Sequence, residues 1–337
     1  MVSLAGRVRF MAELDFQRAS VLLFDPVHVN IRTTRYALNE IGFKSIEACS
    51  TIEDFQRHLR ENSWDLIVAE CSPTKADIFM LVRMIRRGEA TPNPYAVIAL
   101  TSWTRDGGHV RKAIESGADD VIVRPFSTQF AEDRIKTMVR DRKSFVVTSD
   151  YVGPDRRSGD RQTSDDPRVD VPNTLQAKAD GDEEALRDAY QSIRDAKKTI
   201  EAERIRRLAM RVVISAELQF DAKAGPPRDF DPADLMKSAR ELRDQLEQAG
   251  RMEAVQIAEA LLDHARNFRN PDERTVKNFR IAKDLAVGVY AAFADGESIE
   301  KAQDEIAKTV KALRKRLSSE APKSSADDLP ALKAASM

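Results

Sequence analysis

Short apolar runs alternate with amphipathic stretches over the first 143 residues of the chain. Each run is bounded by polar residues, which is typical of a buried strand, and the stretches between them repeat apolar residues at helical spacing. The predicted strands are 20–25, 44–50, 65–70, 95–101 and 119–125, and the predicted helices are 31–43, 51–62, 78–88, 107–117 and 127–142. This alternation predicts an α/β fold: a doubly wound, five-stranded parallel sheet with helices on both faces.

Helical periodicity without a convincing strand takes over in the second half of the chain. A long stretch from about 182 to 220 carries apolar residues on one broad stripe. Asp231-Pro232 and Asn270-Pro271 each pair a capping side chain with a proline, which is typical of a helix start, and Gly250 is a helix stop. We expect an all-α helical bundle, which is also a candidate for dimerisation.

Changes in composition divide the chain into five predicted parts. They are an N-terminal extension (1–19), the α/β domain (20–143), a linker (144–173), the helical domain (174–318) and a disordered tail (319–337).

The predicted linker contains one segment with two readings. In the first, the apolar and aromatic residues Phe145, Val147 and Tyr151 dock back onto the α/β domain. In the second, the segment is an extended connector whose Arg156 and Arg157 are solvated. The polar composition slightly favours the connector.

Polar residues stand where the predicted strands end. Asp25 and Glu70 close the first and third strands, Thr101 and Ser102 close the fourth, and Arg124 closes the fifth. The carboxyl ends of parallel strands lie at one edge of a sheet and form its ligand crevice. We therefore expect these side chains to meet in one site.

These residues, and the order of "VLLFD", "WDLIVAE", "VIALTS" and "SGADDVIVRPF", resemble the CheY-like receiver domain of bacterial two-component response regulators. The resemblance covers roughly residues 20–143 and implies the flavodoxin-like sheet order. It also implies that an Asp ending the third strand accepts a phosphoryl group and that two acids after the first strand hold Mg²⁺. A Thr or Ser after the fourth strand and a Lys before Pro-Phe would bind the phosphate.

The sequence departs from that pattern at three positions. Glu70 stands at the phospho-acceptor position, Pro26 replaces the second acid beside Asp25, and Arg124 stands at the lysine position. Thr101 and Ser102 are retained, so with Arg124 they are remnants of a phosphate site. Asp25 is the one candidate metal ligand left. These departures predict a degenerate pseudo-receiver.

The residues leave three interpretations of the pocket open. Glu70 pairs with Arg124 and mimics a phosphorylated receiver, or the pocket has decayed and the domain only packs against partners, or some phosphorylation remains. We expect no cofactor, and Mg²⁺ only if the acidic pocket is still active. Asp65, before the third strand, reads as a solvated turn acid.

Bulk composition narrows the expected partners. The formal net charge is −1, from 54 basic and 55 acidic residues, which disfavours nucleic acid as a partner. The basic stretch "IEAERIRRLAMR" reads as a solvated helix face. Two cysteines without metal-ligand spacing indicate a reducing, cytoplasmic compartment, and no apolar run is long enough to suggest a signal peptide or a membrane span.

We therefore expect a cytoplasmic two-component-type signalling protein, not an enzyme. Its degenerate receiver domain would act through protein–protein interaction with a sensor kinase or a downstream partner, with the helical domain as output. The alternative is a functional, phospho-accepting response regulator in a phosphorelay. A third candidate, phosphotransfer through His264 in the helical half, is disfavoured because a lone helical histidine is ordinary.

Overall fold

The computed structural model describes residues 14–72, 77–156, 168–218 and 231–293. The chain forms two compact units, Met1–Arg204 and Ile205–Met337, which we describe separately. The sequence places the corresponding boundary at 173/174. The predicted tail (319–337) and most of the predicted N-terminal extension lie outside the described residues.

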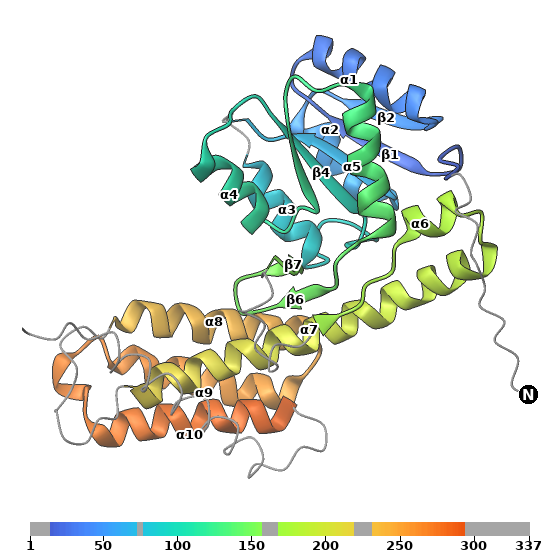
Figure 1. Cartoon of the computed structure of the whole chain (residues 1–337). Helices are drawn as coiled ribbons and strands as arrows, with labels where there is room; N and C mark the ends of the chain where they lie inside the picture. Colours follow the sequence, from blue (N-terminus) through green and yellow to red (C-terminus); the bar gives the residue numbers. More distant parts are fainter. Residues whose placement is uncertain (1–13, 73–76, 157–167, 219–230, 294–337) are drawn as a thin grey trace, which may run out of the picture. The chain divides into compact units, whose positions relative to one another are not determined.

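The first unit is built on a five-stranded parallel sheet, as the sequence predicts (Figure 1). Its order is β2-β1-β3-β4-β5, the flavodoxin-like arrangement. The strands are β1 (Ser20–Phe24), β2 (Ser45–Cys49), β3 (Leu66–Glu70), β4 (Val97–Ser102) and β5 (Asp120–Val123). The helices between and after them are α1 (His28–Ile41), α2 (Ile52–Glu61), α3 (Ile78–Arg86), α4 (Gly107–Glu115) and α5 (Thr128–Arg140).

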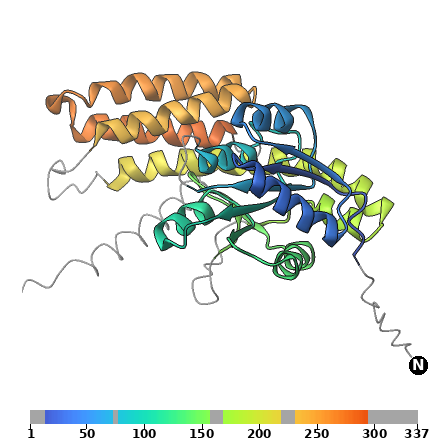
Figure 2. The same ribbon diagram turned by 90° about the horizontal axis from the view of Figure 1, so that it is seen from above.

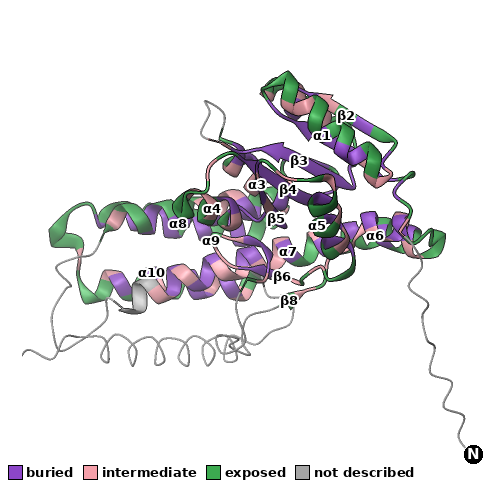
Figure 3. Cartoon of the chain, turned by 45° about the horizontal axis from the view of Figure 1, so that its top comes forward, coloured by how far each residue is buried: buried purple, intermediate pink, exposed green. Residues whose placement is uncertain are grey.

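Helices cover both faces of the sheet, which explains why its strands read as continuous apolar runs (Figures 1 and 2). Along β1, Val21 and Leu23 belong to a core with α1 and α5, whereas Leu22 and Phe24 belong to a core with α2 and α3. Successive side chains of a strand point to opposite faces, so both sets are buried at once. Figure 3 shows the central strands as almost wholly buried.

A second, antiparallel sheet forms within the segment predicted to be a linker. Its strands are β6 (Phe145–Val147), β7 (Val152–Pro154) and β8 (Arg168–Val169), in the order β7-β6-β8. Phe145, Val147 and Val152 share a core with Tyr95 before β4 and with helix residues such as Ile193. The extended-connector reading is therefore wrong, and the docked reading is the one the structure shows.

The β6–β7 hairpin approaches the turn before β5 very closely. Gly117 has φ +100°, and a Cβ there would come within 2.6 Å of the Val152 carbonyl oxygen. Only glycine meets both demands without strain. Arg156, expected to be solvated, donates to the carbonyl oxygens of Ala118 and Asp119, and Arg157 lies outside the described residues.

Buried charges hold the hairpin side of the sheet together. Arg86 of α3 donates to the carbonyls of Gly117, Pro94 and Ala96, each at 2.8 Å, and its guanidinium lies 2.6 Å from the carboxylate of Asp119. Burial lowers the pKa of Arg86 to about 10, so it stays protonated at neutral pH.

A second arginine completes this cluster. Arg142 lies 3.0 Å from the other oxygen of Asp119 and donates to the Tyr95 carbonyl at 2.6 Å. Burial alone would raise the pKa of Asp119, but the charges of Arg142 and Arg86 outweigh it and hold the pKa low. Both guanidiniums lie over the Phe145 ring, at 5.1 and 5.3 Å from its centroid.

Helix α6 (Thr174–Ala179) also packs on the sheet. Its Leu175 joins the core of α1 and α5, and Lys178 Nζ lies 2.7 Å from an oxygen of Asp65. The same oxygen accepts the Ser20 amide at 2.7 Å, and Asp65 is buried. The expectation of a solvated Asp65 is therefore wrong.

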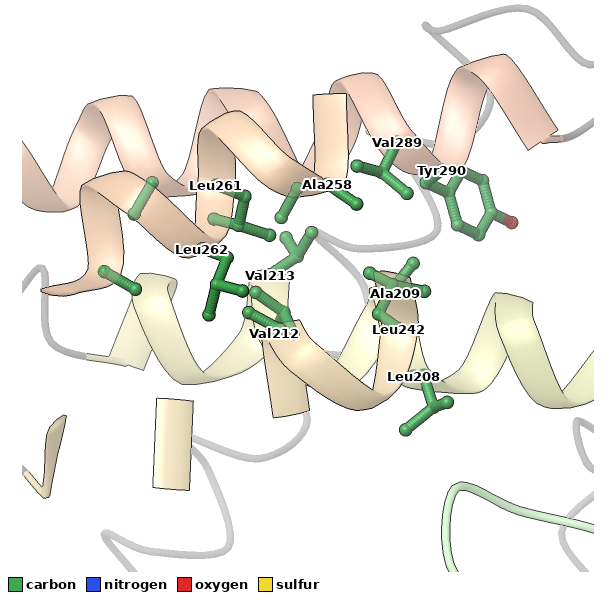
Figure 4. Close-up of a cluster of buried hydrophobic side chains, with 14 of the residues drawn as sticks. Leu208, Ala209, Val212, Val213, Leu242, Ala258, Leu261, Leu262, Val289 and Tyr290 are labelled. Atoms are coloured by element: carbon green, nitrogen blue, oxygen red, sulfur yellow. The ribbon is translucent and has the colours of Figure 1, made fainter. Parts of the chain in front are cut away.

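The second unit contains a helical bundle, as the fold prediction states. Helix α7 (Glu183–Leu218) enters it at Ile205, followed by α8 (Pro232–Gln248), α9 (Met252–Asn267) and α10 (Val276–Phe293). Asp231 caps α8 as predicted, but Asn270-Pro271 begins a short 3₁₀ turn (Pro271–Glu273) before α10 starts. The bundle core is apolar, as Figure 4 shows for Leu208, Val212, Leu242, Leu261 and Val289.

None of the helices in the described ranges combines the length and the apolar character that crossing a membrane requires.

The hairpin packing makes a stability prediction. Replacing Phe145 by Ala removes a ring that is 0% exposed and should lower the free energy of unfolding by about 3–5 kcal/mol. Urea unfolding of the full chain measures this loss. Phe130→Ala, at a ring 48% exposed on α5, is the control and should change stability by about 0.5 kcal/mol or less. Equal effects of the two changes would contradict the docking.

Candidate functional site

Asp25 follows β1 and is fully buried at the carboxyl edge of the sheet. Its Oδ1 accepts the Val27 amide at 2.8 Å and the Asn30 side chain at 3.3 Å, and its Oδ2 lies 3.4 Å from Arg124. Burial raises the pKa of Asp25, and these hydrogen bonds and the arginine charge only partly offset the rise. The site thus disfavours a charge on Asp25.

Glu70 is the last residue of β3, and both of its carboxylate oxygens are engaged. Oε2 accepts the Thr101 hydroxyl at 2.8 Å and lies 3.2 Å from Nε of Arg124. Oε1 accepts the amide of Ser72 at 3.0 Å and also its hydroxyl. Glu70 and Thr101 are register partners on neighbouring strands, which explains why these two side chains meet.

Arg124 follows β5 and bridges the two acids. Its Nε contacts Glu70, whereas its Nη2 contacts Asp25, donates to the Thr34 hydroxyl at 2.7 Å and lies 3.4 Å from the Thr101 hydroxyl. The guanidinium is 6% exposed. The guanidinium therefore does not bind one carboxylate through two nitrogens but contacts two different carboxylates.

The structure brings four of the five predicted residues into one hydrogen-bonded cluster: Asp25, Glu70, Thr101 and Arg124. Ser102 is also buried, but its hydroxyl accepts the Thr104 amide at 3.2 Å. Ser102 thus supports the loop after β4 rather than the acids.

Several residues of this site, Asn30 beside Asp25 among them, were not predicted from the sequence. Thr34 reaches Arg124 from α1, and Ser72 links Glu70 to the amide of Trp103, which donates to the Ser72 hydroxyl at 3.0 Å. The exposed Trp103 ring lies 5.9 Å from the Arg124 guanidinium. The one usable signal was the position of Ser72, two residues after a strand-ending acid, where a side chain often bonds back to the loop.

The described residues of this crevice do not fit the Mg²⁺ that the resemblance implies. Pro26 supplies no carboxylate, and no group of three acidic, histidine or cysteine side chains in the described ranges could hold a metal ion. Each unit of positive charge placed about 4 Å from the Arg124 guanidinium costs about 4 kcal/mol at an effective dielectric constant of about 20. The arginine thus takes the place that a cation would need.

His264 of α9 is engaged in helix packing. Its Nε2 lies 2.8 Å from the Asn278 carbonyl oxygen, and its ring meets Phe268 edge-on. A nitrogen that donates to a carbonyl has no lone pair for a phosphoryl group, so this contact opposes phosphotransfer through Nε2.

Comparison with known proteins gives relatives for part of the chain. No family model matches. The chain is 31% identical over 135 residues to the uncharacterized transcriptional regulatory protein YclJ of Bacillus subtilis, covering 39% of this chain and 56% of YclJ. It is 36% identical over 111 residues to the transcriptional regulatory protein AfsQ1 of Streptomyces coelicolor, covering 33% and 47%. The chain thus spans about half the length of these relatives.

The phosphate regulon transcriptional regulatory protein PhoB of Rhizobium meliloti is 30% identical over 116 residues, covering 34% of this chain and 49% of PhoB. Among solved structures, HP1043, an orphan response regulator of H. pylori, matches with a TM-score of 0.32 at 23% identity, covering 37% of this chain and 98% of that one. The response regulator DrrB of Thermotoga maritima matches with a TM-score of 0.33 at 22% identity, covering 38% and 55%.

These names correct one expectation drawn from the composition. Net charge disfavoured nucleic acid as a partner, but all three relatives are named transcriptional regulatory proteins. The expectation that nucleic acid is an unlikely partner is therefore wrong. A net charge near zero sums over the whole chain and says nothing about a local basic surface.

The raised pKa of Asp25 makes a testable prediction. Asp25 then binds a proton more tightly in the folded state than in the unfolded state. Its contribution to the free energy of unfolding therefore falls as pH rises from the ordinary pKa of an aspartate through the raised pKa of the folded state. Asp25→Asn lacks this loss, so the variant should gain stability relative to the wild type across that window. Urea unfolding between about pH 4 and 8 measures the difference.

Asp54→Asn is the control for this titration. The hydrogen bond from Arg57, together with Thr51, lowers the pKa of Asp54. Its contribution to stability is therefore lost only as pH falls below the ordinary carboxyl pKa, so the difference between Asp54→Asn and the wild type should stay nearly constant between about pH 4 and 8. A difference between Asp25→Asn and the wild type that stays constant with pH would contradict the burial argument.

Proposed function

We propose that this chain, whose first unit contains a CheY-like receiver domain of the response-regulator type, is a two-component-type signalling protein with a pseudo-receiver. A buried ion pair between Glu70 and Arg124 holds the receiver in one signalling state without a phosphoryl group. The protein acts in the cytoplasm through contacts with other macromolecules and without catalytic turnover.

The observation that carries this proposal is the double contact on one oxygen of Glu70. The resemblance assigns phosphate binding to a hydroxyl after the fourth strand and to a cation before Pro-Phe. Thr101 and Arg124 stand at these positions, and both contact Glu70 Oε2, at 2.8 and 3.2 Å. The carboxylate thus has the partners expected for a phosphoryl oxygen.

The same contacts oppose the alternative of a phospho-accepting receiver. Attack on phosphorus needs a free carboxylate oxygen and a metal ion that neutralises the transferred group. Both Glu70 oxygens already accept hydrogen bonds, and the arginine lies between the two acids.

Transcription is the output that we propose for the whole protein. The support comes from the three relatives, each named a transcriptional regulatory protein. The matches cover only 33–39% of this chain and about half of each relative. We therefore propose that the helical unit contributes to transcription through contacts of its own. A sensor kinase can still be a docking partner under this proposal, but it would not pass on a phosphoryl group.

Phosphorylation in vitro tests the pseudo-receiver. Incubation with acetyl phosphate and Mg²⁺ should leave the wild type unmodified in intact-mass spectrometry. The triple variant Glu70→Asp, Pro26→Asp, Arg124→Lys restores the residue types of the family pattern and should form a hydroxylamine-sensitive adduct. An adduct on the wild-type receiver would overturn the proposal and favour the phosphorelay alternative.

A gene-replacement experiment tests whether the ion pair holds a signalling state. Glu70→Ala removes both contacts, so the transcript profile of that strain should resemble that of a deletion strain. Glu70→Gln keeps the size but loses the charge and should give an intermediate profile. Glu40→Gln, at an exposed position of α1, is the control and should match the wild type.

Thermal unfolding of each Glu70 variant separates loss of signalling from loss of folding. A folded Glu70→Ala variant with a wild-type transcript profile would show that Glu70 is no switch. The decayed-pocket interpretation would then replace the proposed one.

A further inference from the structure

The junction of α9 and α10 has a local excess of positive charge, although the whole chain is nearly neutral. Residues 264–283 contain six arginines and lysines against two acids, whereas the whole chain has a formal net charge of −1. Four of the six are exposed and form the surface that we call the α9–α10 basic surface: Arg266, Arg269, Lys277 and Arg280.

Most of this charge is not neutralised within the molecule. Arg266 pairs with Asp263 one turn earlier in α9. Arg269, Lys277 and Arg280 form no ion pair with another residue in the part of the chain that the structure describes. Lys277 and Arg280 are three positions apart on α10, so they lie on the same face of the helix.

The surface rests on a rigid base. Helices α9 and α10 lie side by side in both views, and their buried residues share one core (Figures 1 and 2). Arg274 Nε donates to the Phe268 carbonyl at 2.9 Å across the connecting turn. Asn278 donates to both the carbonyl and the carboxylate of Glu273 at 2.8 Å. A fixed base lowers the entropy lost on binding a ligand.

The basic stretch "IEAERIRRLAMR" at 200–211 lacks these properties. Arg204 is buried and lies 3.5 Å from Glu89, and Arg206 lies over the Tyr290 ring at 5.5 Å. Arg211 pairs with Asp234. These arginines are thus engaged within the molecule, whereas Arg269, Lys277 and Arg280 have no ion pair among the described residues.

We infer that the α9–α10 basic surface binds the phosphate backbone of double-stranded DNA, an inference that rests on the proposed transcriptional output. Cations that have no ion-pair partner in the described ranges complement the negative charge of the phosphates, and release of counterions would drive the binding. The nearby rings of Phe268 and Phe279 are buried. They cannot stack on bases, so the surface is unsuited to single-stranded nucleic acid.

Fluorescence anisotropy with a labelled duplex of about 30 base pairs, at about 50 to 200 mM salt, tests this inference on the full chain. Lys277→Glu with Arg280→Glu should lower the affinity at least tenfold. The control, Lys237→Glu with Arg240→Glu, makes the same charge change at exposed positions of α8 and should lower it about twofold or less. For Lys277→Ala with Arg280→Ala, the slope of log K against log salt should fall by about 1.8.

Three results would overturn the inference. They are no duplex binding by the full chain at low salt, an equal loss of affinity in both charge-reversed variants, and tighter binding to an RNA duplex or to anionic phospholipid vesicles than to DNA. A failure of the DNA-binding inference can be told apart from a failure of the pseudo-receiver proposal. Phosphorylation of the wild-type receiver would leave this surface in place, and absent duplex binding would leave the Glu70 contacts in place.

Discussion

The carboxyl edge of the sheet depends on one buried guanidinium, that of Arg124. At 6% exposure this guanidinium is largely shielded from bulk water. It therefore requires carboxyl and hydroxyl partners. These are Asp25 after β1, Thr34 in α1, Glu70 in β3 and Thr101 in β4. Removing one charged partner of such a cluster typically costs about 3–5 kcal/mol, because the remaining charge is buried without compensation.

The opposite end of β5 is organised by the same principle. Asp119 precedes this strand and lies between the guanidiniums of Arg86 and Arg142, whereas Arg124 follows it. The first cluster binds carbonyls and packs under Phe145, so it attaches the small β7-β6-β8 sheet. The second cluster binds carboxylates and hydroxyls, so it forms the site. Buried arginines thus lie at both ends of β5. Those before the strand attach the small sheet, and the one after it organises the candidate site.

Sequence reasoning succeeded where a pattern is local and failed where it depends on distant partners. Strands β1, β3 and β5 are short apolar runs, and the last residue or the one after it falls at the crevice, so Asp25, Glu70 and Arg124 could be placed from spacing alone. The β6–β7 hairpin is short and lies in polar sequence, and its burial comes from contacts with Tyr95 and Ile193, far away in the chain. Periodicity carries no information on such contacts.

The proposed ion pair has a consequence for how such a protein is regulated. A phosphoryl group is added and removed, whereas Glu70 and Arg124 are permanent parts of the chain. An equilibrium between two receiver conformations then moves only if a ligand binds them with different affinity. The signal can otherwise change only through the amount of protein. The exposed Trp103 ring lies over the Arg124 guanidinium, and the Trp103 backbone amide donates to Ser72, which donates to Glu70. A partner that moves this residue would therefore act on the surroundings of the ion pair. Under the proposed function, input therefore reaches the crevice by contact rather than by phosphoryl transfer.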